Sequence, residues 1–171
     1  MATVVVFTGL PGTGKSTLAE RVAVSTGAPA FSGDWLMGAL KPYGVLDSLD
    51  RTTYVDMYYN LIATLMTRQL MLGQPAVIDC LITDRVGTRW RETAAAYGAE
   101  LAIVECICSD IGLQRSRIVG RRRNIPGWHE VGWDHVERMR IQFPSLTIDH
   151  VEVDSVSPVE DNVRLVLETL A

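Results

Sequence analysis

The sequence predicts an α/β fold in which five parallel strands form a sheet with helices on both faces. Apolar, β-branched runs alternate along the chain with longer segments of helical periodicity. This alternation is typical of parallel strands joined by right-handed crossovers. In addition, a glycine-rich segment joins the first strand to the first helix. Ligands of open parallel sheets bind beyond the carboxyl ends of the strands, so functional residues are expected there.

The first half of the chain contains two expected strands and two expected helices. Residues 3–8 form a continuous apolar run, as in a strand buried on both faces, and a helix is expected at 15–25. Residues 29–32 are a short strand candidate. Apolar side chains then recur at helical spacing over 51–72, and Gly73 is a suitable stop for that helix.

The second half continues the same alternation. Short apolar runs predict strands at 76–81, 101–108 and 150–154. Helical periodicity between and after them predicts helices at 84–97, 111–123, 131–142 and 158–170.

Composition places the chain among cytoplasmic globular proteins. Its 171 residues suit a single domain, 1–171, and the net charge of −4 gives no attraction to nucleic acid or to anionic membranes. No apolar run reaches the length of a membrane helix, so no membrane partner is expected. The three cysteines form no CxxC pair and lie in apolar runs, which favours free thiols in a reducing compartment.

The glycine-rich segment matches the phosphate-binding pattern G-x-x-x-x-G-K-[ST] at every position. The expected nucleotide contacts are Gly9, Leu10, Pro11, Gly12, Thr13, Gly14, Lys15, Ser16 and Thr17. Backbone N–H groups and the following helix N-terminus hold phosphates, Lys15 neutralises the β- and γ-phosphates, and the Ser16 hydroxyl is a ligand for Mg²⁺. The alternative is a glycine-rich turn without a ligand, but the strand-loop-helix context favours a P-loop that binds ATP with Mg²⁺.

Two carboxylates at the ends of predicted strands are further candidates. Asp79 ends the run Ala76-Val-Ile-Asp79, where a second acid holds the magnesium shell in P-loop proteins; the alternative is a structural Asp at a strand end. Asp34 follows the second strand candidate, where it can accept the proton of an attacking hydroxyl. The alternative for Asp34 is an N-cap of a helix that begins near Trp35.

Together with a later arginine cluster, these motifs resemble those of the small P-loop kinase group. This group includes the kinase domain of polynucleotide kinases, gluconate kinase and the AAA_33-type ATP-binding proteins. The resemblance covers nearly the whole chain. It implies a P-loop NTPase fold with strand order 2-3-1-4-5, an Asp34 that activates the acceptor hydroxyl, and an arginine-bearing lid that closes over ATP.

The lid is expected at about 111–135. Five arginines lie between positions 115 and 123, ahead of a Pro-Gly pair. Arg117 and Arg121 are the expected catalytic members, because helical spacing would place them on one face, from which their charge could stabilise the transferring phosphoryl group. The alternative is a solvated basic helix.

The predicted activity is ATP-dependent phosphoryl transfer to a hydroxyl of a small molecule. Polynucleotide kinases of the resembled type carry an Arg three residues after the activating Asp, whereas this chain has Met37. Nucleic acid is therefore a less favoured acceptor. Asp50, Arg51 and Tyr54 are candidate acceptor contacts. A 5′-hydroxyl nucleotide or polynucleotide kinase and a regulatory ATPase without an acceptor remain the alternatives.

Overall fold

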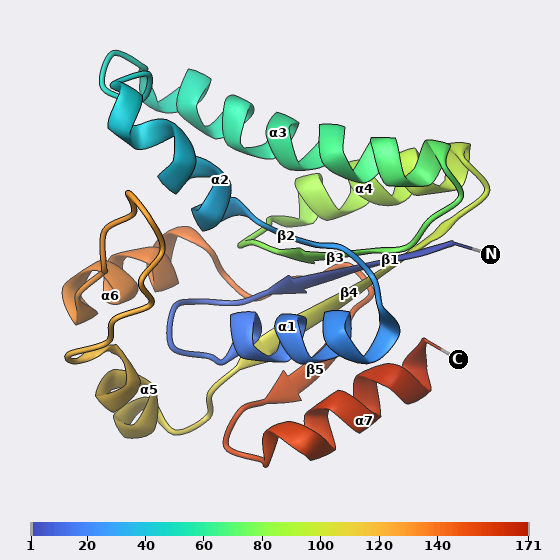
Figure 1. Cartoon of the computed structure of the whole chain (residues 1–171). Coiled ribbons are helices and arrows are strands. Elements are labelled where there is room, and N and C mark those ends of the chain that lie inside the picture. The colour runs from blue at the N-terminus through green and yellow to red at the C-terminus, as the bar shows by residue number, and fades with distance from the viewer. Residues whose placement is uncertain (1, 171) are drawn as a thin grey trace.

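The computed structural model describes residues 2–170 and contains one parallel sheet of five strands in the order β2-β3-β1-β4-β5. Figure 1 shows the strands running together, with their carboxyl ends on the side of helices α5 and α6. The strands are β1 (Thr3–Thr8), β2 (Ala30–Ser32), β3 (Ala76–Asp79), β4 (Glu100–Ile107) and β5 (Val151–Asp154). The predicted fold and strand order are both confirmed.

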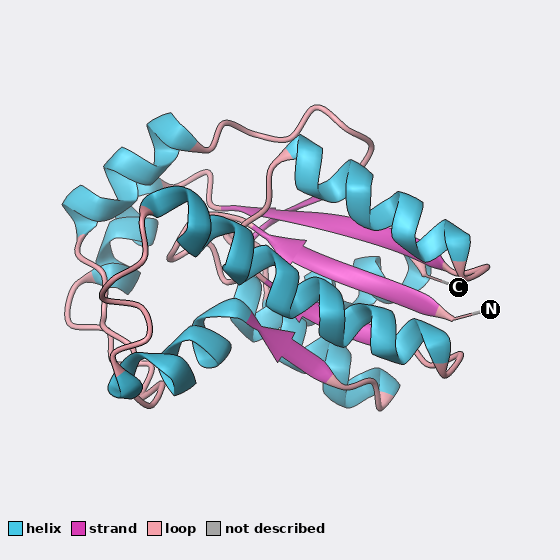
Figure 2. Cartoon of the chain, turned by 90° about the horizontal axis from the view of Figure 1, so that it is seen from above, coloured by secondary structure: helices cyan, strands magenta, loops and turns pink. Residues whose placement is uncertain are grey.

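Helices cover both faces of the sheet. Their bounds are α1 (Lys15–Thr26), α2 (Gly33–Leu40), α3 (Arg51–Met71), α4 (Asp84–Ala96), α5 (Ile111–Ile118), α6 (Trp133–Gln142) and α7 (Val159–Thr169), with a 3₁₀ turn η1 (Lys41–Tyr43). Helices α1 and α7 pack on one face and α3 and α4 on the other, as the two views of Figures 1 and 2 agree. Among residues 2–170, no helix is long and apolar enough to cross a membrane.

The central strand β1 divides its side chains between two apolar cores. Val4 and Val6 pack with α3 and α4, whereas Val5 and Phe7 pack with α1 and α7. All four are almost completely buried. Burial on both faces is what the continuous apolar run predicted, and it holds β1 rigidly below the glycine-rich loop.

Helix boundaries differ from expectation where functional residues lie. Helix α5 ends at Ile118 instead of near residue 123, because Val119 is extended and Gly120 has a positive φ of 71°. Helix α2 begins at Gly33, with Ser32 at its N-cap position. Asp34 is therefore inside the first turn and not at the N-cap position, so the N-cap alternative is wrong.

Candidate active site

The loop between β1 and α1 is folded in a way that only glycine allows at several positions. Gly9 has a φ of 141°, and a Cβ added there would lie 2.3 Å from the Cys106 carbonyl oxygen. At Gly12, with a φ of 85°, a Cβ would lie 3.0 Å from the Gln114 carbonyl oxygen. A side chain is therefore excluded at these two positions of the loop, which lies at the N-terminus of α1, and this is the arrangement needed to bring backbone N–H groups to phosphate oxygens.

Lys15 and Asp79 face each other across the β1–β3 edge. Strand β3 pairs with β1, with Asp79 opposite Phe7, and the Lys15 Nζ lies 3.9 Å from the Asp79 Oδ1. That Oδ1 atom is buried and accepts no hydrogen bond from residues 2–170. A buried carboxylate oxygen without a donor, beside the loop that carries Ser16, fits the oxygen-rich shell of Mg²⁺.

Asp34 is half-buried and is paired with an arginine that the sequence did not single out. The Arg123 Nη1 donates to the Asp34 Oδ2 at 2.5 Å, and the Arg123 Nε donates to the Glu130 Oε2 at 3.1 Å. Burial would lower the pKa of the Arg123 guanidinium, but the carboxylates of Asp34 and Glu130 outweigh it and raise that pKa. Strand β3 separates β2 from β1, as in the predicted strand order, so Asp34 approaches the P-loop edge from beyond β2, the outer strand.

The two lid arginines singled out from the sequence have different environments. Arg117, on α5, donates through Nη1 to the Ser155 Oγ at 2.7 Å and to the Gly12 carbonyl at 3.3 Å, and through Nη2 to the Ser155 carbonyl at 2.8 Å. It thus joins the P-loop to the β5–α7 connection. Arg121 lies beyond the end of α5, so the prediction that both share one helical face is wrong.

Arg121 is a half-buried cation with few partners. Its Nε and Nη2 atoms have no hydrogen-bond acceptor among the described residues, and its nearest carboxylate oxygen is the Glu130 Oε2, 3.7 Å from Nε. Burial lowers the pKa of its guanidinium, and the neighbouring Arg123 lowers it further. Since Arg121 lines both cavities described next, its free N–H groups are suited to an anionic ligand.

Two cavities meet at this edge of the sheet. One, of about 510 Å³, follows the P-loop, α1 and the β5–α7 connection, and we call it the nucleotide-side cavity. The other, of about 720 Å³, lies among α3, α6 and the 119–132 segment, and we call it the acceptor-side cavity. The residues that line both are Lys15, Ser32, Asp79, Arg121 and Arg123.

The candidate residues are distributed between these cavities. Lys15 lies at the junction, Ser16 and Thr17 line the nucleotide-side cavity, and Asp34 lines the acceptor-side cavity. Of the candidate acceptor contacts, Arg51 and Tyr54 line the acceptor-side cavity.

Asp50 and Met37, which the sequence analysis also considered, line neither cavity. Asp50 caps α3 by accepting hydrogen bonds from the Thr52 and Thr53 backbone N–H groups. Met37 is completely buried, so its position on α2 faces the protein interior.

Sequence reasoning missed residues that connect the lid segment to the P-loop. The buried Gln114 donates to the Pro11 carbonyl at 2.9 Å and accepts from Arg140 at 2.8 Å. Neither Gln114 nor Arg123 belongs to a recognisable pattern. Only the density of arginines between 115 and 123 marked this region.

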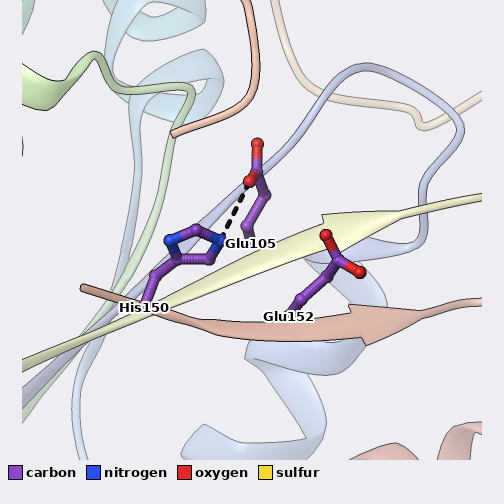
Figure 3. Close-up of side chains that lie close together, drawn as sticks. All are labelled: Glu105, His150 and Glu152. Atoms are coloured by element: carbon purple, nitrogen blue, oxygen red, sulfur yellow. Dashed lines mark ion pairs between the residues drawn. The ribbon is translucent and has the colours of Figure 1, made fainter. Parts of the chain in front are cut away.

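A third group of polar side chains lies on strand β4 and at the start of strand β5, with His150 directly before β5, and it lines neither cavity. Figure 3 shows Glu105, His150 and Glu152 close together, with donor atoms within 4.8 Å of one another. The His150 Nε2 lies 3.2 Å from the Glu105 Oε2, and Glu105 also accepts from the Leu146 N–H. Burial raises the pKa of Glu105. These contacts tie the α6–β5 connection to the sheet.

Solved structures of known proteins have a similar fold. A sugar kinase from Janibacter sp. HTCC2649 superposes with a TM-score of 0.68 at 19% identity, covering 99% of this chain and 94% of that one. A gluconokinase from Sinorhizobium meliloti 1021 gives 0.69 at 22% identity, covering 99% and 91%. The shikimate kinase of Aquifex aeolicus gives 0.58 at 12% identity, covering 98% and 95%. No curated protein matched the sequence.

These structures share the P-loop kinase fold with this chain, as the motifs predicted. The model of the AAA_33 family, described as an AAA domain, matches residues 4–146. That match spans the P-loop, both candidate carboxylates and the arginine-rich segment. The chain therefore belongs to the AAA_33 family.

Proposed function

We propose that this protein is a phosphotransferase that moves the γ-phosphoryl group of ATP to a hydroxyl of a small molecule. The observation that carries this proposal is the junction of two cavities at Lys15, Asp79 and Arg121. An ATPase without an acceptor would need only the nucleotide-side cavity. A second cavity of about 720 Å³ that begins at the same residues is what a transferase needs for its acceptor.

In this proposal the triphosphate occupies the nucleotide-side cavity. Residues 9–17 hold the phosphates through backbone N–H groups, and Lys15 neutralises the β- and γ-phosphates. Ser16 and Asp79 would hold Mg²⁺, which would supply positive charge to stabilise the phosphates. Arg117 keeps the β5–α7 connection against the P-loop, so its contribution is to shape the cavity.

Asp34 is the proposed base. As the acceptor oxygen forms its bond to the γ-phosphorus, its proton passes to the Asp34 carboxylate while the bond to the β-phosphate oxygen breaks and ADP leaves. Arg121 supplies positive charge to the transferring group, because its N–H groups have no acceptor within the described protein. Arg123 donates a hydrogen bond to Asp34, and Asp34 has to accept from the acceptor hydroxyl in place of Arg123 when the acceptor binds.

We further propose that the whole chain, 1–171, acts as one catalytic domain in the cytoplasm, with residues of about 111–135 forming a lid. A small acceptor is supported by the fold neighbours, which are described as sugar kinase, gluconokinase and shikimate kinase. The net charge of −4 and the buried Met37 both disfavour a nucleic acid acceptor.

The test is acceptor-dependent ADP formation from Mg-ATP, measured across sugars, other hydroxylated metabolites, aromatic alcohols, nucleosides and oligonucleotides. Stimulation by a small alcohol is the expected result. Stimulation by nucleosides or 5′-hydroxyl oligonucleotides alone would replace the proposal with a nucleotide or polynucleotide kinase. ADP formation that no acceptor stimulates would identify a regulatory ATPase.

A further inference from the structure

The acceptor-side cavity is larger than phosphoryl transfer alone requires. Its volume of about 720 Å³ exceeds that of the nucleotide-side cavity, about 510 Å³. Cavities of roughly 300–1,000 Å³ bury most of the surface of a drug-sized molecule. The cavity therefore has room for an acceptor whose body extends well beyond the reacting hydroxyl, and the walls of the cavity indicate the chemistry that would fit.

Apolar and aromatic side chains form a large part of these walls, beside charged side chains such as Asp56, Arg85 and Arg121. The apolar and aromatic ones come from α3, α4, α6 and the 119–132 segment, and they are Tyr54, Val55, Tyr58, Tyr59, Val86, Trp128, Val131, Met139 and Phe143. Although the lid covers this region, none of the nine is fully buried, and Val55 is 37% exposed. Tyr58, Tyr59 and Val86 also pack against the core, so most of the apolar surface available to a ligand belongs to the other six residues.

Several polar groups of the cavity are already occupied within the protein. The Tyr59 hydroxyl donates to the Leu81 carbonyl at 2.9 Å, so this residue presents its ring. Arg51 donates to the Gln142 side chain at 3.2 Å, and Asp34 accepts from Arg123. A polyol or a sugar acid needs a hydrogen-bond partner for most of its oxygens, and a buried polar group without one is costly.

We propose that the phosphate acceptor is an alcohol carried on an aromatic or otherwise apolar body. This inference rests on the proposed function and narrows its acceptor class. The hydroxyl reaches Asp34 at the inner end of the cavity, and the apolar body packs between α3 and α6. The Tyr58 and Tyr59 rings, in edge contact at 5.2 Å, offer a preformed aromatic wall.

The experiment compares two probe classes as acceptors: phenylpropanol and naphthylethanol against glucose and gluconate. Phosphoryl transfer from Mg-ATP and acceptor binding by ligand-observed NMR are measured for wild type and for two variants. Val55→Glu places a charge on the apolar wall at an exposed helical position. Val24→Glu is the matched control, because Val24 is 84% exposed on α1 and lines neither cavity.

The aryl alcohols are expected to bind and to accept phosphate, and the sugars are not. Val55→Glu should lower kcat/KM for the aryl alcohols about tenfold or more, the effect of losing one apolar contact, while Val24→Glu leaves it unchanged. Preference for glucose or gluconate would overturn the inferred class but leave the proposed phosphotransferase intact. Failure of the aryl alcohols to bind at all would also overturn the inference. The wider acceptor screen then judges the proposed function independently.

Discussion

Replacing Asp34 by Asn separates the role of this residue as a base from its role as the ion-pair partner of Arg123. The substitution keeps the shape of the side chain, and its amide oxygen can still accept from the Arg123 guanidinium. It removes the negative charge that receives the hydroxyl proton. Loss of a positioned base costs about 10²–10⁴-fold in rate. At ~1.36 kcal/mol per tenfold, that is roughly 3–5 kcal/mol in activation free energy.

The expected cost in stability is much smaller. The Asp34 side chain is 31% exposed and that of Arg123 is 17% exposed, so solvent screens the pair on one side. Weakening such a pair costs about 1 kcal/mol of unfolding free energy. A normal affinity for Mg-ATP by titration calorimetry, a melting temperature lowered by a few degrees, and a loss of transfer of at least a hundredfold are therefore expected together.

Arg123→Gln is the matched control, because it breaks the same ion pair while keeping the Asp34 carboxylate. If Asp34 acts as the base, Asp34→Asn slows transfer far more than Arg123→Gln does. If Asp34 serves only to hold Arg123, both variants slow transfer equally and the double variant is no slower than either. Equal losses of that kind, or normal turnover by Asp34→Asn, would refute the reasoning.

Further predictions concern the phosphate-binding residues, the acceptor and pH. Lys15→Ala should raise the Kd for Mg-ATP at least tenfold. Its melting temperature should be unchanged, because the nearest carboxylate oxygen is 3.9 Å from the Lys15 Nζ and such a pair adds little stability. Tight Mg-ATP binding in calorimetry would exclude the role assigned to Lys15. Arg121→Ala should lower kcat about 10²-fold in steady-state kinetics. Arg117→Ala loses its hydrogen bonds to Gly12 and Ser155, so it should mainly lower the melting temperature. A larger loss of kcat in Arg117→Ala than in Arg121→Ala would contradict the two assigned roles. Oligonucleotides with a 5′-hydroxyl should label poorly from ³²P-labelled ATP on gels, and efficient labelling would promote the nucleic acid alternative. Hydrogen bonds from the Thr147 hydroxyl and N–H lower the pKa of Asp84, so this carboxylate stabilises the fold above its unfolded pKa of about 4 and the contribution is lost as pH falls below that value. Urea unfolding between pH 3 and 6 should accordingly show a shallower pH slope for Asp84→Asn, and identical slopes would contradict the assignment.

The P-loop could be predicted from sequence because its function is encoded locally. A buried strand, closely spaced glycines and a Lys-Ser pair at a helix start lie within fourteen consecutive residues, 3–16. Backbone conformation and ligand contacts in such a loop depend on neighbours along the chain. The strand order was predictable only through the resemblance to P-loop kinases, since apolar runs alone do not specify which strands pair.

The surroundings of Asp34 could not be predicted, because they depend on a contact between residues 89 positions apart. Arg123 is one of five nearby arginines, and nothing in their spacing distinguishes it. The expected helix over 111–123 also hid the break after Ile118, which sends Arg117 and Arg121 to different partners. Similarly, Asp34 is the second residue of α2, and a shift of two residues decides between a cap and a side chain free to face the cavity.

The central claim is that the γ-phosphoryl group goes to an alcohol and not to water. Phosphorus-31 NMR of wild-type protein with Mg-ATP and an acceptor alcohol follows both fates in one sample. The account predicts a new phosphomonoester resonance that grows in step with ADP and is absent from a Lys15→Ala control. Growth of inorganic phosphate alone, at the same rate with and without acceptor, would contradict it.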